Sequence, residues 1–434
     1  MDQPYTALIR TVLARQHFRP DDPTPYDDTG WSLDALRNVT VYSIADSSVL
    51  AQPMRLLTAD DAVAGTVSGS GGMLLVPHLG DWRSAVLPWK VGGATVSVTD
   101  SATTVDGTTF PAGTFVLANS ATARDAVAKL GLKATAVAAA PGVKSHAVAL
   151  PRIAFIHTWI ETQNEGWLRH AFEDMGIPFT YMSTQRLKEP GLLDRYDVVV
   201  FPHVNGAPTT IVNGRAMVGP AIAWKKSALT PNLGVIDSTD DIRPGMGLEG
   251  LAALQHFVER GGLLITEGNS SLLPVEYGFN PSVSVATPNR LMARGAVFNA
   301  QVVDRQSPIL YGYDRMTFPV YFNQAPLFNV QGASRSPRGP QVAQNAPDPS
   351  IAKAADAQRA RVILRFDTNA DSLLVSGLLD NGGEMAGKAA VVDAPLGKGH
   401  MVLFGIRPMW RYETQGSYAM LINAMVNWNA LSGR

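Results

Sequence analysis

Six residues of this chain have side chains and positions that suit the binding of a small ligand or a metal ion. They are His157, Trp159, His203, Glu267, Asn269 and Arg407. Four of the six lie one or two residues past predicted strands, and the carboxyl ends of parallel strands meet at one edge of a sheet. Because histidine and glutamate are zinc ligands, His157, His203 and Glu267 make a candidate metal site. The alternative is a set of ordinary hydrogen-bonded polar residues at a wet sheet edge.

Two H-x-x-E tetrads have the spacing that supplies two zinc ligands in carboxypeptidases. They are His170–Glu173 and His256–Glu259. Both fall in segments with helical periodicity, where positions three apart share one face and commonly hold a surface pair. A metallopeptidase also needs a distant third ligand and an acid–base glutamate. We therefore interpret both tetrads as structural.

Nucleophilic catalysis has little support in the sequence. The chain has no cysteine, which removes thiolate nucleophiles, thiolate metal ligands and disulfides. Ser270 follows a predicted strand, but no G-x-S-x-G pattern surrounds it. The run Leu396–Gly399 has the look of a phosphate-binding loop, yet it joins two predicted strands and opens no helix. That run predicts a hairpin turn.

The candidate residues are positioned by short apolar strands that alternate with amphipathic helices. Strands are predicted over 152–156, 179–182, 197–201 and 263–266, with helices over 166–175 and 248–260. This alternation is typical of an α/β fold with a parallel, doubly wound sheet, and we expect a flavodoxin-like strand order. Further strands are predicted over 297–303, 318–322, 361–366, 373–379, 389–392 and 401–405, before a closing helix over 418–431.

Three parts are predicted along the chain. Residues 1–38 form an N-terminal helix and linker arm, and residues 39–150 form a small α/β domain. Residues 151–434 form the larger domain, with long insertions at 203–247 and 332–356. The first insertion is long enough to be functional or a lid, and the second has few large apolar groups, so we expect it to be an exposed excursion.

The small domain is predicted from mixed strand and helix patterns. Strands are expected over 39–44, 73–76, 94–98 and 114–118, and helices over 82–89 and 121–130. Turn-forming runs, Asp106-Gly107 and Phe110 to Gly113, separate two of these strands. These patterns predict a small α/β unit ahead of the larger domain.

The composition is that of a compact globular protein, with 46% hydrophobic and 17% charged residues. The 36 lysines and arginines nearly balance the 37 aspartates and glutamates, so no long-range field attracts nucleic acid or an anionic membrane. No stretch is apolar enough to cross a bilayer, and the first residues lack the apolar run of a signal peptide. We expect no nucleic-acid partner and no membrane span.

Five stretches of the sequence carry a family resemblance. They are PYDDTGWSL at 25–33, FPAGTFV at 110–116, NEGW at 164–167, FVERGG at 257–262 and GKGHMVLFG at 397–405. Together they resemble the region that follows the catalytic domain in large bacterial zinc carboxypeptidase-like proteins of the carboxypeptidase A type. The resemblance implies a secreted or periplasmic protein whose zinc lies in an upstream peptidase domain. We therefore expect no cofactor in this chain.

The region from about residue 152 onward resembles a class I glutamine amidotransferase-like domain. Active members of that group use a cysteine after one sheet strand and a histidine after a later strand. This chain has no cysteine, and Arg407 stands at the place of the histidine, in the run Phe404–Pro408. Without a nucleophile and its base, amidotransfer is not expected.

Three functions remain open at this point. The first is a non-catalytic accessory or binding module of a secreted zinc carboxypeptidase-like protein, with the upstream peptidase domain as its partner. The second is a metal-dependent hydrolase that uses His157, His203 and Glu267. The third is a carbohydrate- or peptide-binding module in which Trp159 and Arg407 contact the ligand, with Glu165 and Trp167 as further candidates for the wall of the crevice.

Overall fold

Continuous apolar runs form the central strands of the larger sheet, because a parallel strand that is covered on both faces must be apolar on both. In the computed structural model these strands are β9 (Ile153–His157), β11 (Val198–Phe201) and β12 (Leu263–Glu267), and every residue in them is buried. With β10 (Thr180–Ser183) and β20 (Gly399–Phe404) they form the parallel order β10-β9-β11-β12-β20. This is the flavodoxin-like order, and the predicted α/β class is confirmed.

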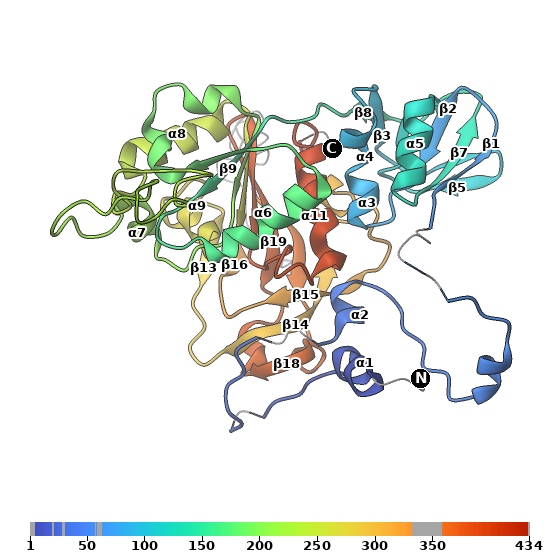
Figure 1. Cartoon of the computed structure of the whole chain (residues 1–434), viewed down its shortest axis with the longest axis horizontal. Helices are drawn as coiled ribbons and strands as arrows, with labels where there is room; N and C mark the ends of the chain where they lie inside the picture. Colours follow the sequence, from blue (N-terminus) through green and yellow to red (C-terminus); the bar gives the residue numbers. More distant parts are fainter. Residues whose placement is uncertain are drawn as a thin grey trace, which may run out of the picture.

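Two lobes, one around each large sheet, lie side by side in Figure 1, and the N-terminal arm runs along the lower side of that view. The structure describes residues 5–19, 21–27, 31–56, 58, 63–331 and 358–432. The excursion predicted at 332–356 lies outside the described residues. None of the helices in the described ranges combines the length and apolar character needed to span a membrane.

Helices cover both faces of the parallel sheet. α6 (Gln163–Met175) and α11 (Gln415–Val426) share one hydrophobic core with Phe155, whereas α8 (Gly247–Glu259) shares the other core with Ile156. Adjacent residues of one strand point to opposite faces, so β9 contributes to both cores. The helix α6 ends at Gly176, whose left-handed backbone (φ +61°) closes it as the sequence predicts.

Antiparallel strands extend this sheet on one side. They are β19 (Ala389–Leu396), β17 (Arg361–Phe366), β14 (Met292–Val302) and β15 (Thr317–Phe322), with β13 (Val283–Ala286), β16 (Leu327–Val330) and β18 (Leu374–Asp380) attached beside them. The residues between β19 and β20 make the predicted hairpin, in which Leu396 pairs with Gly399. The added strands of the predicted fold are therefore present, and β13 and β16 were not predicted.

The small lobe holds a six-stranded sheet in the order β1-β7-β2-β6-β3-β8. These strands are β1 (Thr66–Gly69), β2 (Met73–Val76), β3 (Val96–Thr99), β6 (Phe115–Ala118), β7 (Lys133–Val137) and β8 (Ser145–Ala147), beside a hairpin of β4 (Thr103–Val105) and β5 (Thr108–Phe110). Its helices are α3 (Trp82–Ala85), α4 (Leu87–Lys90) and α5 (Ala121–Lys129). The single helix predicted over 82–89 is wrong: Pro88 has no N–H to continue the ladder, so two short helices form.

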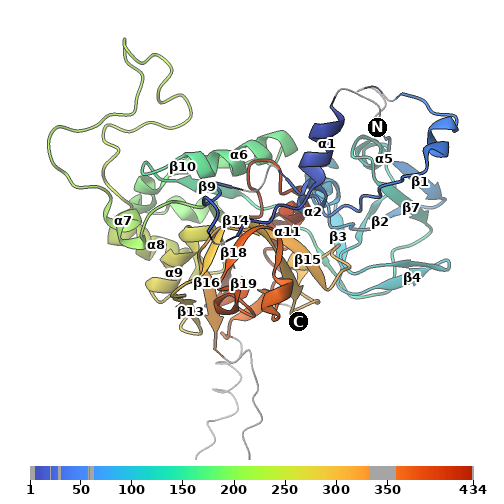
Figure 2. The ribbon, with the colours of Figure 1, turned by 90° about the horizontal axis from the view of Figure 1, so that it is seen from below.

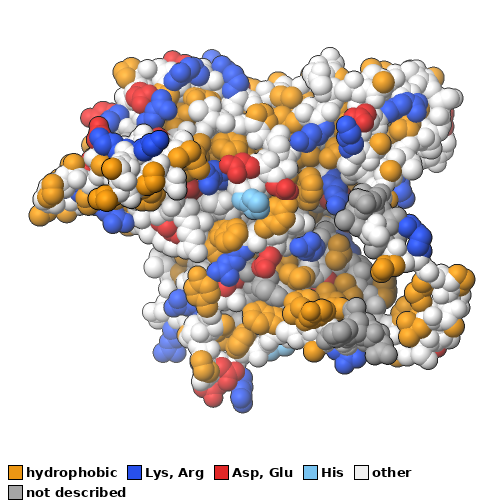
Figure 3. Space-filling view, viewed as in Figure 1, with side chains coloured by type: hydrophobic (Ala, Val, Ile, Leu, Met, Phe, Trp, Pro, Cys, Tyr) orange, Lys and Arg blue, Asp and Glu red, His pale blue; other side chains and the backbone are white. Residues whose placement is uncertain are grey.

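The N-terminal arm contains α1 (Thr6–Leu13), α2 (Leu33–Leu36) and a long segment without regular structure. The strand predicted at Val39–Ile44 is wrong, because this β-branched run pairs with none of the described strands and stays exposed. Apolar side chains are visible at the surface along this part of the chain, at the lower right of Figure 3.

The predicted insertion at 203–247 begins with α7 (Pro208–Asn213) and continues as an irregular loop that reaches away from α7 and α8 (Figure 2). α9 (Leu272–Glu276) follows β12. Short 3-10 helices occupy several connections: η1 (Ser47–Ala51), η2 (Thr184–Lys188), η3 (Leu192–Arg195), η4 (Gly268–Ser271), η5 (Pro308–Leu310), η6 (Ala370–Ser372) and η7 (Gly382–Glu384).

Candidate functional site

The carboxyl edge of the parallel sheet carries two separate sites. His157 and Trp159 line a pocket beside β9 and β10, whereas the other four candidate residues form a buried polar cluster beside β11, β12 and β20. The structure does not bring His157 together with His203 and Glu267. His157 is hydrogen-bonded to Asp237, whereas His203 contacts Arg407. Over the described ranges, no three histidine, aspartate or glutamate side chains are grouped so that they can hold a metal ion. The candidate metal site of His157, His203 and Glu267 that the sequence suggested is therefore not formed.

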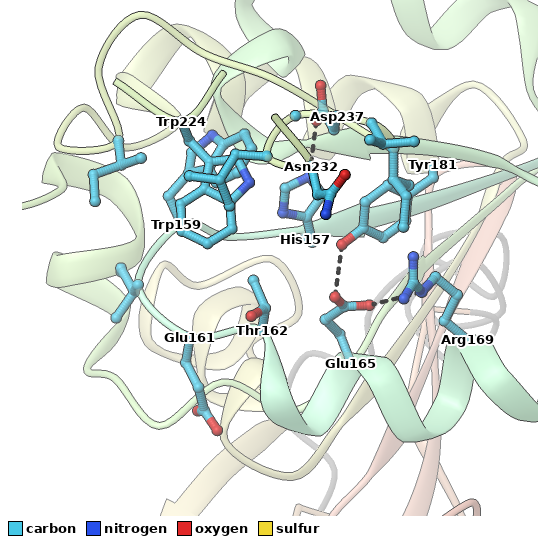
Figure 4. Close-up of a pocket in the computed structure, with 16 residues that line it drawn as sticks. His157, Trp159, Glu161, Thr162, Glu165, Arg169, Tyr181, Trp224, Asn232 and Asp237 are labelled. Atoms are coloured by element: carbon cyan, nitrogen blue, oxygen red, sulfur yellow. Dashed lines mark hydrogen bonds and ion pairs between the residues drawn. The ribbon is translucent and has the colours of Figure 1, made fainter. Parts of the chain in front are cut away.

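Aromatic rings form the walls of the pocket, which has a volume of about 330 Å³ (Figure 4). The imidazole of His157 stacks on Tyr181, with ring centroids 4.3 Å apart and planes only 5° from parallel. Trp159 meets His157 edge to face at 4.7 Å, and the Trp224 ring lies 6.2 Å from Trp159 at a 47° tilt. The walls thus offer flat apolar surfaces that suit a ring-shaped ligand.

Distant segments of the chain build this pocket. Tyr181 belongs to β10, and Glu165 lies in the first turn of α6. The insertion at 203–247 supplies Trp224 and the run 232–237, so it forms one wall. Sequence analysis missed Tyr181, Trp224 and Asp237. The long insertion after a strand was the one signal that pointed to Trp224 and Asp237, and no signal singled out Tyr181 within its predicted strand.

A hydrogen bond between a histidine and an aspartate fastens the insertion to the sheet. The Asp237 carboxylate accepts hydrogen bonds from Nε2 of His157 and from the backbone N–H of Ser183, each at 2.8 Å. Burial raises the pKa of Asp237, but the bonds from His157 and from backbone N–H groups outweigh it, and the pKa lies below its usual value. Asp237 is therefore ionised at neutral pH and holds the imidazole in place.

Three buried polar atoms of the pocket residues have no hydrogen-bond partner among the described residues: Trp159 Nε1, Glu165 Oε2 and Arg169 Nε. Glu165 is 5% exposed, and its Oε1 accepts a bond from the Tyr181 hydroxyl at 2.6 Å. Its Oε2 lies 3.9 Å from Nε of Arg169, which is too far for a direct hydrogen bond. Burial raises the pKa of Glu165, although Tyr181 and Arg169 oppose the rise. Trp167, in contrast, packs in a separate core beside the arm and does not line the pocket.

The second site centres on a neutral histidine. His203 is buried, and burial together with the nearby Arg407 guanidinium lowers its pKa to about 3. Its Nδ1 accepts the backbone N–H of Asn269 at 2.9 Å, and its Nε2 lies 3.0 Å from Arg407 and 2.8 Å from the Asn205 side-chain oxygen. Both ring nitrogens are thus engaged within the protein.

Glu267 completes this cluster. Burial raises its pKa to about 8, while Arg407 and the backbone N–H groups of His203 and Met409 act in the opposite direction. At neutral pH the carboxyl is therefore mostly protonated. The Arg407 guanidinium lies over the Trp410 ring at 4.7 Å, so its charge is partly met by a cation–π contact.

The turn after β12 has the strand-to-helix geometry that presents a nucleophile in other α/β enzymes. Here the residue with left-handed backbone is Gly268 (φ +54°), and a Cβ at that position would lie 2.2 Å from Nδ1 of His203. Ser270 is fully buried, and its hydroxyl bonds to the carbonyls of Phe201 and Glu267. This turn therefore carries no available nucleophile.

The two H-x-x-E tetrads lie on helix surfaces. His256 and Glu259 form an exposed pair, 3.7 Å apart, on α8. His170 on α6 packs against the Tyr412 ring at 5.1 Å. The predicted surface pair is present at His256 and Glu259. At the other tetrad His170 contacts Tyr412, and this position on the helix surface agrees with a structural role.

A serine–histidine–aspartate arrangement occurs at the opposite end of β20. His400 contacts the Ser432 hydroxyl through Nε2 and Asp393 through Nδ1, the latter at 2.7 Å. Arg361 pairs with the second oxygen of Asp393 and donates to the Leu431 carbonyl at 2.8 Å. These contacts fasten the last described residues to the β19–β20 hairpin.

No protein-family model matches this chain, and no curated protein is significantly similar to it. Solved structures that align with it include a cytoplasmic protein from Salmonella typhimurium LT2 (12% identity, 64% of this chain, 99% of that chain, TM-score 0.36). Others are a putative ThuA-like protein from Bacteroides uniformis ATCC 8492 (12% identity, 63% of this chain, 89% of that chain, TM-score 0.33) and the beta-galactosidase from Bacillus circulans sp. alkalophilus (11% identity, 62% of this chain, 30% of that chain, TM-score 0.33).

Proposed function

We propose that this chain is a binding module without catalysis of its own, and that its ligand occupies the pocket beside β9 and β10. The observation that carries the proposal is the pocket, which combines aromatic walls with buried polar atoms that lack partners. Sites for small molecules are largely apolar, with a few polar groups that orient the ligand. The pocket has that composition.

The second site supports binding without turnover. Its turn carries Gly268 where a nucleophile would stand, and the imidazole of His203 already fills the adjacent space. The low pKa of His203 makes it a weak base near neutral pH. Acyl-transfer chemistry therefore lacks both a nucleophile and a poised base at this turn.

We further propose that the module serves a secreted or periplasmic zinc carboxypeptidase-like protein beside its peptidase domain. The five family-like stretches support this role. So does the segment Val39–Leu56, in which eight large apolar side chains are exposed: Val39, Val41, Tyr42, Ile44, Val49, Leu50, Met54 and Leu56. Exposed apolar surface of this extent commonly marks an interaction site.

A peptidase assay tests the absence of catalysis. The purified chain is incubated with peptides that have free carboxyl termini, with and without added zinc. We expect no release of terminal residues, because the described residues supply no metal-binding group. Hydrolysis that a chelator abolishes, or stoichiometric zinc that disappears in a His157→Ala variant, would instead favour the metal-dependent hydrolase.

The accessory role has its own test in the gene. We expect the coding sequence ahead of residue 1 to encode a zinc peptidase domain in the same reading frame. A stop codon there, or a domain of another kind, would contradict the accessory role and leave the pocket proposal intact.

A further inference from the structure

We propose that the ligand of the pocket is a neutral saccharide, with one sugar ring stacked on Trp159 and Trp224 and its hydroxyls bound to Glu165 and Arg169. This inference rests on the proposed function, since it names the ligand class of the same pocket. Three features of the pocket carry it: the kinds of polar atom that lack partners, the spacing between two of them, and the shape of the aromatic wall.

The unpartnered atoms include both donors and an acceptor. Trp159 Nε1 and Arg169 Nε are donors, and Glu165 Oε2 is an acceptor. An ammonium ligand can satisfy only the acceptor, and a phosphate or carboxylate ligand can satisfy only the donors. A hydroxyl group both donates and accepts, so a polyhydroxylated ligand can satisfy all three atoms. Leaving such buried groups unpaired is costly, which favours the ligand that pairs them all.

The gap between Glu165 and Arg169 suits a single bridging hydroxyl. Their facing atoms, Oε2 and Nε, are 3.9 Å apart. Both atoms are enclosed, so a ligand oxygen reaches the gap only after a small side-chain shift, and it then accepts from the guanidinium N–H and donates to the carboxylate.

Charge argues against an anionic ligand. The pocket residues include three carboxylates, Glu161, Glu165 and Asp237, against the single guanidinium of Arg169 and the imidazole of His157. Two of these carboxylates are already engaged. Asp237 pairs with His157, and Glu161 accepts the backbone N–H of Asn205 at 2.6 Å. Carboxylates outnumber guanidinium groups in the pocket, which disfavours an anion, while no uncommitted carboxylate pair is left to hold a cation.

The aromatic wall suits the C–H face of a sugar ring. Trp159 and Trp224 are tilted by 47° with centroids 6.2 Å apart, so they form one continuous angled surface and leave no slot between them. A pyranose ring presents C–H groups on its face and hydroxyls at its edge. Stacking on this surface directs the edge hydroxyls toward α6, where Glu165 and Arg169 lie (Figure 4).

Calorimetric titration of the full chain tests the inference. The neutral probes are D-glucose, D-galactose, N-acetyl-D-glucosamine and cellobiose, the charged probes are D-glucuronate and D-glucosamine, and an alanine tetrapeptide represents peptides. Trp224→Ala removes part of the stacking surface, and Glu165→Gln keeps the shape of the side chain but replaces the carboxylate. Leu229→Ala is the control, because Leu229 lies on the same insertion, is 94% exposed and does not line the pocket.

We expect at least one neutral sugar to bind, and each pocket variant to weaken it about tenfold or more, while Leu229→Ala leaves it unchanged. Binding of only the peptide or the charged sugars, weakened by the same variants, would overturn the saccharide inference and keep the pocket as the site. If no probe binds, or if neither pocket variant changes the affinity of the probe that binds, the saccharide inference and the proposed pocket function both fail.

Discussion

Burial sets the protonation of the polar residues at the sheet edge. Glu267 and His203 are both enclosed, so each favours its neutral form, and the raised pKa of one and the lowered pKa of the other follow from the same cause. Asp237 keeps its charge because His157 and backbone N–H groups surround it. Residue types alone indicated a polar edge, and the enclosure of each group determines its chemistry.

Replacement of Glu267 by glutamine should flatten the pH dependence of stability. The pKa of Glu267 is 4.5 in an unfolded chain and about 8 in the folded chain. Between pH 4.5 and pH 8 the folded state therefore holds a proton that the unfolded state has lost. The stability that this proton gives is complete below 4.5 and is lost as the pH rises through 8. Urea unfolding from about pH 5 to 8 should therefore show the advantage of Glu267→Gln over the wild type growing by roughly a few kcal/mol. Unfolding free energies of the wild type and Glu267→Gln that change in parallel with pH would contradict this prediction.

Gly268→Ala should destabilise the fold more than Gly278→Ala. Both glycines have left-handed backbones, so both variants incur the strain of a side chain there. Only at Gly268 does the added Cβ meet His203, whereas Gly278 faces open space. We expect a difference of about 1–3 kcal/mol in the free energy of unfolding. The additional substitution His203→Ala should recover part of it, and equal losses for the two glycine variants would refute the clash.

At the scale of elements, the pocket depends on the irregular insertion at 203–247, which is held against two regular strands. The fixing point is Asp237, which bonds to the end of β9 through His157 and to β10 through Ser183. A rigid sheet edge thus holds a loop that carries Trp224, and loops that are held in this way commonly bear binding residues.

Asp237→Ala should loosen the insertion. Loss of the carboxylate removes the bonds to His157 and Ser183, so backbone amides in 224–237 should exchange faster with solvent and become easier to cleave. Asp240→Ala is the matched control, because the 86% exposed side chain of Asp240 pairs only with Lys225 in a surface ion pair of small value. Equal hydrogen exchange in the two variants would show that Asp237 does not anchor the loop.

The strands of the parallel sheet were predictable because their apolar runs are continuous and sharply bounded. β7 was missed because Lys133–Val137 is rich in alanine and resembles its neighbours in composition. The order of the parallel strands correctly indicated that His203, Glu267 and Arg407 lie at one edge of the sheet, but the expected convergence of His157 with His203 and Glu267 does not occur. The pocket was harder to predict, since Trp224 and Asp237 reach it through a loop whose path no local pattern determines.

The whole molecule depends on α11 as the joint between its lobes. Asn423 contacts Nε2 of His78 at 2.7 Å, and Asn427 contacts Nε2 of His146 at 2.8 Å. Both histidines belong to the small lobe, so one helix of the larger lobe holds its neighbour at two points.

Asn423→Ala should weaken this joint. The substitution leaves Nε2 of buried His78 without its contact to Asn423, and it removes the bonds from Asn423 to the carbonyls of Ile309 and Tyr311. We expect a loss of about 1–3 kcal/mol and a calorimetric trace in which the lobes unfold separately. Gln415→Ala, on the same helix but away from the small lobe, should keep a single transition. A single transition in both variants would mean that other contacts couple the lobes.

The N-terminal arm also covers part of a sheet edge. Phe18 donates its N–H to the Gly377 carbonyl at 3.2 Å, and the Gly377 N–H donates to Gln16, which places the arm alongside β18. Bare strand edges recruit strands from other molecules. Loss of residues 5–19 should therefore increase self-association, with light scattering that rises more steeply with concentration than that of the full chain. Unchanged light scattering after removal of the arm would show that the arm does not protect this edge from association.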